Sequence, residues 1–94
     1  MELNELPGSE FILSGLDDLE QGKNNTIGSL LITIASRRLT EAGLDIPKIP
    51  LVSEPELALY AHLQQERSDA YPYYNALLRS LNSFCTALER RNDR

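Results

Sequence analysis

The chain lacks the side chains that most often build a reactive centre. Its 94 residues include no tryptophan, one cysteine and one histidine. One cysteine excludes an internal disulfide, and one histidine with one cysteine leaves a zinc site short of ligands unless carboxylates supply the rest. No serine stands in a glycine-flanked nucleophile elbow, and no glycine pattern matches a phosphate-binding loop. We therefore expect no enzyme, no metal and no cofactor.

A long apolar run is also missing. The longest apolar segment, from Leu30 to Ala35, is interrupted by Thr33, and a bilayer needs roughly 20 apolar residues. The first residues include Glu2 and Glu5, where a secretory leader would be basic. Together with the single cysteine, these absences predict a cytoplasmic protein without membrane contact.

Net charge is −5 and is unevenly distributed. Residues 1–25 carry six acids and one base, whereas residues 26–94 carry eight of each. An acidic chain has little attraction for phosphate backbones, so this balance argues against nucleic acid. With 41% apolar and 24% charged residues the composition is typical of a globular protein, and the length predicts a single domain over residues 1–94.

The strongest pattern lies between Tyr74 and Leu88. Apolar residues recur there at steps of three and four, which is typical of one face of a helix. The stripe contains Tyr74, Leu77, Leu78, Leu81, Phe84, Cys85 and Leu88. Such a stripe must be covered, either within the fold or by a second chain. Cys85 on the stripe is predicted to be a small buried hydrophobe.

Two helices are predicted before this one in the first half of the chain. Ser9 can cap a first helix that stops near Gly22, with Ser14 as an alternative start. Thr26 can cap a second helix over residues 27–42, whose first half is apolar on most sides. Gly43 fits the left-handed residue after that helix, with Leu44 folding back on Leu39.

A third helix is predicted from a capping box in which Ser53 precedes Glu56 by three residues. It ends near Arg67 or Ser68. The fourth helix begins near Ala70 or Pro72, capped by Asp69, and runs to Arg91. The step from Tyr71 to Pro72 argues against one unbroken helix running through both the third and the fourth segment, although a single kinked helix stays open.

The predicted fold is all-α: a four-helix orthogonal or up-down bundle with helices three and four as an antiparallel hairpin. An extended strap over residues 44–52, containing Pro47 and Pro50, joins helices two and three. Residues 1–8 are expected to be a loose lead-in ending in a turn at Pro7 and Gly8.

The absence of reactive constellations favours a small non-enzymatic interaction or regulatory module. We expect a homodimer, or contact with another protein, because the stripes offer more apolar surface than short helices easily bury. The residues expected at the contact are Leu77, Leu81, Phe84, Leu88, Leu31 and Ile34. The four tyrosines either close the hairpin end of the core or line a groove or interface.

Two other functions are carried by particular residues. A DNA-binding regulator would use Arg37 and Arg38 with the basic tail, including Arg90 and Arg91. An enzyme would need a cleft joining the aromatic and basic side chains of the second half, namely Tyr73, His62 and Arg79.

Overall fold

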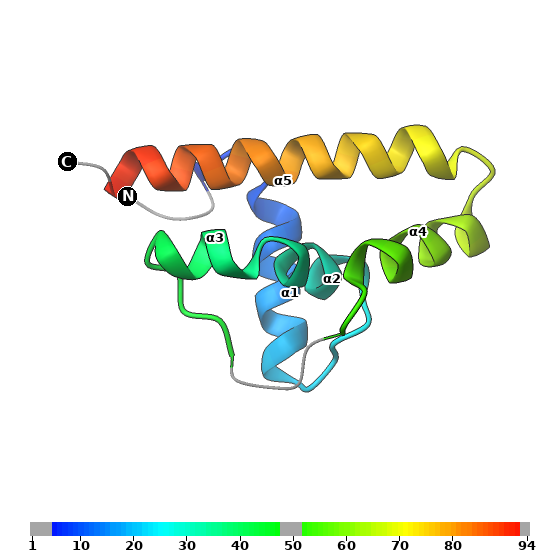
Figure 1. Cartoon of the computed structure of the whole chain (residues 1–94), viewed down its shortest axis with the longest axis horizontal. Coiled ribbons are helices and arrows are strands. Elements are labelled where there is room, and N and C mark those ends of the chain that lie inside the picture. The colour runs from blue at the N-terminus through cyan, green and yellow to red at the C-terminus, as the bar shows by residue number, and fades with distance from the viewer. Residues whose placement is uncertain (1–4, 48–51, 93–94) are drawn as a thin grey trace.

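Figure 1 shows a computed structural model of the chain, which describes residues 5–47 and 52–92. Within these ranges every regular element is an α-helix and no strand occurs. The helices are α1 (Ser9–Glu20), α2 (Ile27–Ile34), α3 (Ser36–Glu41), α4 (Pro55–Glu66) and α5 (Ala70–Asn92). The predicted all-α class is confirmed, but the described ranges contain five helices rather than four.

The helices are arranged around the short α2. Its residues from Gly28 to Thr33 are all buried, which fits the lack of a polar face in the sequence. α1 stands across α2, while α4 and α5 pack on it from other sides (Figure 1). With 23 residues, α5 is about 34 Å long at 1.5 Å per residue, so it spans most of the 42 Å long axis.

α1 and α2 approach each other closely at Gly15 of α1 and Gly28 of α2, both buried. A Cβ atom added to Gly28 would lie 2.8 Å from both the Cα and the N of Gly15. A Cβ added to Gly15 would likewise overlap the carbonyl group of Gly28. The two backbones therefore touch where they cross, and only glycine fits at either position.

The single helix predicted over residues 27–42 is wrong, because the segment breaks at Ala35 into α2 and α3. Ala35 has φ −105° and ψ 18° and serves both as the last cap of α2 and the first of α3. The Thr33 hydroxyl donates to the carbonyl of Ser29 at 2.8 Å, a bond that competes with the helix ladder and bends helices. Ile32, Thr33 and Ile34 are also β-branched, which lowers helix propensity.

Helix starts follow the sequence only in part. Thr26 caps α2 as predicted, and Ser29 completes a reciprocal capping box with it. The start of α1 at a capping Ser9 is wrong: Gly8, at φ 76°, is the N-cap. A Cβ at Gly8 would lie 2.7 Å from the carbonyl oxygen of Ser80, so close packing on α5 determines this start.

The predicted capping box at Ser53 and Glu56 is also wrong. α4 begins at Pro55 with Glu54 as N-cap, and no side chain caps it. The shift of one residue places Pro55 at the first helical position, which its fixed φ favours.

Helix ends agree better with the sequence. Gly22 and Gly43 both have positive φ, at 80° and 96°. Each follows its helix with the paired backbone bonds of a Schellman ending. After Gly43, the N–H of Leu44 donates to the carbonyl of Leu39 at 3.0 Å, as predicted.

The predicted strap lies partly outside the described residues, which leave out 48–51. On either side of that gap Leu44 is buried, and Ile46 and Val52 pack against the core. The strap as a whole stays a prediction. The first four residues of the predicted lead-in also lie outside the described part, and Leu6 within it packs against the core.

Most of the stripe on α5 is buried within the single chain, and Tyr74 and Leu78 are half-buried. Leu77, Leu81, Phe84, Cys85 and Leu88 are each at most 6% exposed. Cys85 is a free, buried thiol as predicted. Within the described ranges, no helix combines the length and apolar character needed to cross a membrane.

We expect Gly15→Ala to destabilise the protein by about 1–3 kcal/mol, because the added methyl group overpacks the crossing of α1 and α2. Helix propensity alone would predict the opposite sign, a gain of about 1 kcal/mol. Urea denaturation followed by circular dichroism measures the difference. Ser14→Ala, at the neighbouring exposed position, is the matched control and should change the midpoint little. A higher midpoint for Gly15→Ala would contradict the close crossing.

Candidate interaction surface

The hairpin of α4 and α5 carries the aromatic residues of the chain's second half. The two helices run in opposite directions and join through a short turn at one end of the molecule (Figure 1). Arg67 in this turn donates two hydrogen bonds to the Asp69 carboxylate, at 2.6 and 3.2 Å. Its guanidinium carbon also lies 3.8 Å from the centre of the Tyr73 ring. The turn is thereby fixed by an ion pair and a cation–π contact.

Tyr60 on α4 links the two helices through its ring. Its centroid lies 5.5 Å from Tyr74 and 6.4 Å from Tyr71, both in edge-to-face orientation, the preferred geometry for aromatic pairs. Tyr60 and Tyr74 are half-buried and pack against the core. Burial and the nearby Glu56 carboxylate raise the pKa of Tyr74 above its usual value. The prediction that tyrosines close the hairpin end of the core therefore holds for these two rings.

Tyr71 and Leu57 do not share this burial. The exposed fraction is 64% for Tyr71 and 67% for Leu57. Leu57 lies one turn before Tyr60 on α4, and Tyr60 in turn contacts Tyr71. The only other large apolar side chain exposed in the described residues is Leu13 on α1, at 37%. The hairpin thus presents two solvent-exposed side chains, Leu57 and Tyr71, next to the half-buried Tyr60 and Tyr74. We call these four residues the hairpin patch.

A groove runs along α5 next to this patch. Its volume is about 550 Å³. Its described lining comes from α5 alone: Pro72, Asn75, Leu78, Arg79 and Asn82. Leu78 is half-buried and packs on the core, so it forms an apolar floor. The two asparagines and Arg79 supply amide and guanidinium groups at the rim.

The contact residues predicted from the sequence lie elsewhere. Leu31 is 1% exposed, and Leu77, Leu81, Phe84 and Leu88 are at most 6% exposed. Ile34 is half-buried against the same core. These side chains complete the core of one chain, so a partner reaches them only if the helices rearrange, as in a helix-swapped dimer.

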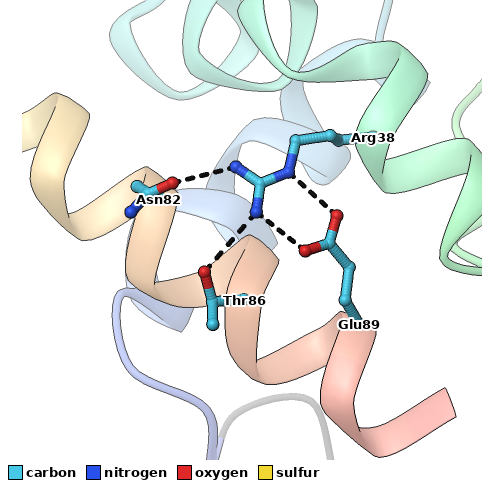
Figure 2. Close-up of polar contacts among 4 residues, drawn as sticks. All are labelled: Arg38, Asn82, Thr86 and Glu89. Atoms are coloured by element: carbon cyan, nitrogen blue, oxygen red, sulfur yellow. Dashed lines mark hydrogen bonds and ion pairs between the residues drawn. The ribbon is translucent and has the colours of Figure 1, made fainter. Parts of the chain in front are cut away.

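Arg38, one of the residues proposed for nucleic-acid binding, joins α3 to α5 (Figure 2). Its Nε and Nη2 atoms donate to the two carboxylate oxygens of Glu89 at 2.9 and 2.8 Å. Its Nη1 donates to the side-chain carbonyl of Asn82 at 2.9 Å, and Nη2 approaches the Thr86 hydroxyl at 3.5 Å. A fork-shaped, two-bond pair of this kind fixes geometry as well as charge. We call these four residues the Arg38 cluster.

The charge of Arg38 is therefore balanced within the chain. The Glu89 carboxylate raises the pKa of Arg38 above its usual value, and hydrogen bonding by Arg38 lowers the pKa of Glu89 below its ordinary 4.5. Arg37 points away, highly exposed, and pairs with Glu41 at 3.3 Å. Arg90 is exposed and Arg91 half-buried near the end of α5. Binding of DNA through these four arginines stays a prediction, and the Arg38 guanidinium is already bound by Glu89, Asn82 and Thr86.

A second pocket, of about 360 Å³, contains the only histidine. It lies between α1, the start of α2 and α4. Its lining is Phe11, Ser14, Asp18, Asn25, Thr26, Ile27, Gly28, His62 and Glu66. Asp18 accepts a hydrogen bond from the Thr26 hydroxyl at 2.7 Å. No group of three or more possible ligands that could hold a metal ion occurs among the residues the structure describes.

The aromatic and basic residues named for an enzyme are not brought into one cleft in the described part of the chain. His62 lines the pocket beside α1, and Arg79 lines the groove on α5. Tyr73 packs beneath Arg67. Burial raises the pKa of the Cys85 thiol above its usual value, which disfavours the thiolate form.

Comparison with known proteins gives no relative: no family model, no curated protein and no solved structure matches the chain.

Sequence reasoning named the tyrosines, Tyr71 among them, but missed the exposure of Leu57. Leu57 lies on the same helix as core residues, but only Leu59 and Leu63 of α4 are buried. A helix with two core residues per three turns has a narrow buried face, so a third apolar residue 160° around from Leu59 must point outward. The angle of about 160° between Leu57 and Leu59 was the feature of the sequence that could have predicted an exposed Leu57.

Because Arg38 holds α3 to α5, Arg38→Met should lower the melting temperature, whereas Arg37→Met, at a fully exposed pair, should not.

Glu89 has a lowered folded pKa, so its stabilising contribution is present above pH 4.5 and is lost as the pH falls further. Glu89→Gln should therefore flatten the loss of stability below pH 4.5 relative to the unaltered chain. Thermal melts from neutral to acidic pH measure both effects. Equal melting temperatures for the two arginine variants would contradict a structural role for the Arg38 cluster.

Proposed function

We propose that this protein is a small non-enzymatic interaction module that forms a homodimer through the hairpin patch and the adjoining groove on α5. The observation that carries the proposal is the exposure of Leu57 and Tyr71, at 67% and 64%. A large exposed apolar side chain next to an aromatic cluster is typical of a binding surface, and tyrosine is enriched among the residues that dominate binding energy.

The surface has the mixed composition of a protein contact. Apolar side chains lie at its centre, while amides and Arg79 lie at the groove rim. Interfaces combine an apolar core with a polar rim in this way. Hydrogen bonds among the described residues leave no buried side-chain polar atom unsatisfied, so the interior itself offers no unpaired group that would mark a reactive site.

A second copy of the chain is the partner that the charge of this surface favours. Glu56 acts electrostatically on Tyr74 of the patch and Arg79 lines the groove, so charges of both signs border this surface. A two-fold contact brings the same face against itself, and a charge-balanced face is tolerated there. A cytoplasmic location belongs to the same proposal, since the single cysteine is a buried free thiol.

Sedimentation equilibrium and light scattering test the proposal. We expect a concentration-dependent dimer whose dissociation constant rises at least about tenfold in Leu57→Asp or Tyr71→Asp, because a charge would replace a central apolar contact. Circular dichroism should show unchanged helix content, since both side chains are exposed in the single chain.

Leu13→Asp is the matched control, because Leu13 is the remaining exposed large apolar residue among those described and lies on α1. It should leave dimerisation unchanged. A protein that stays monomeric at submillimolar concentration would remove the proposal, as would equal effects of all three aspartate variants.

A further inference from the structure

We infer that two copies of the protein pair through antiparallel α5 helices, with Tyr71 of each copy packing onto Leu78 in the groove of the other. This inference rests on the proposed dimer and deepens it, because it assigns the contact to one helix stripe and one register.

The spacing of the two residues on α5 defines the register. Tyr71 and Leu78 are seven residues apart, which places them on nearly the same stripe about 10.5 Å apart along the helix. A two-fold axis passes midway between them, near Tyr74 and Asn75. Tyr71 of each copy then faces Leu78 of the other copy. One contact therefore forms twice, as a symmetric interface requires.

The groove supplies a place for the incoming ring. Leu78 forms its floor and Pro72 one end, so the aromatic face meets apolar atoms. Asn75 and Asn82 line the same groove and can donate to the phenol oxygen at the end of the ring. Tyr71 suits this role because it is mostly exposed in the single chain and has few rotamers to lose on binding.

Charge favours self-pairing of this half of α5 over the other half. From residue 70 to residue 82 the helix carries one charged side chain, Arg79, whereas residues 89–91 are all charged. Two copies of the first half therefore meet with little like-charge repulsion.

Cysteine cross-linking tests the register directly. The expected result is a disulfide in an oxidised mixture of Tyr71→Cys and Leu78→Cys chains, joining one chain of each kind. Each variant alone should cross-link far less, because two copies of position 71, or of position 78, are about two helix turns apart in this pairing. The native thiol does not interfere, since Cys85 is 1% exposed.

Ser83→Cys mixed with Tyr71→Cys is the control, because Ser83 is exposed and lies about 120° round the helix from the stripe. Cross-linking in this control equal to that of the test mixture would overturn the register. If the mixture of Tyr71→Cys and Leu78→Cys chains itself sediments as a dimer but gives no disulfide, the α5 pairing is overturned and the proposed dimer stands. A monomer in sedimentation would overturn both. As an independent measurement, Tyr71→Ala should weaken dimerisation at least about tenfold, and an unchanged constant would count against the Tyr71 contact.

Discussion

The contact on which the rest of this structure depends is the crossing of α1 and α2 at Gly15 and Gly28. Because neither residue has a side chain, the two backbones approach within van der Waals distance, and a Cβ on either would overlap the other. This approach lets α2 lie at the centre with Gly28 to Thr33 buried. α1 covers one side of α2, and α4 and α5 cover the remaining sides. The eight residues of α2 therefore contact every other helix of the described fold.

A central helix with no polar face also determines what happens at its ends. α2 cannot continue into the polar segment that follows without burying arginines, and the chain turns at Ala35 instead. The turn lets Arg38 reach Glu89 and Asn82 across 51 and 44 residues of sequence (Figure 2). The Arg38 cluster therefore joins α3 to α5. Arg38, which the sequence suggested for nucleic-acid binding, thus contacts α5 within the chain. Five residues of the apolar stripe of α5 lie in the core, whereas Tyr71 is exposed and Leu78 is half-buried at the groove.

The predictability of the individual elements follows the range of the interactions that form them. Thr26, Gly22 and Gly43 were correctly predicted because their partners lie within six residues. Ser9 was wrongly predicted as a cap because the packing of Gly8 on Ser80, far away in the sequence, determines where α1 begins. Ser53 was wrongly predicted as a cap because the neighbouring Pro55 takes the first position of α4. Of the seven residues predicted for the buried stripe on α5, five are buried, and Tyr74 and Leu78 are half-buried. Its assignment to a partner is not supported by the burial of those side chains within one chain.

The sequence by itself determined the all-helical class, most of the residues that lie on the buried face of α5 and the helix ends at the two glycines. These depend on local periodicity, backbone conformation and residue types, which a single chain displays directly. Only the tertiary structure decided that Arg38 pairs with Glu89, that Gly15 meets Gly28 and that Tyr71 and Leu57 stay in water while Tyr60 and Tyr74 do not. Each of these depends on the relative placement of helices far apart in the sequence, and no local pattern encodes that placement.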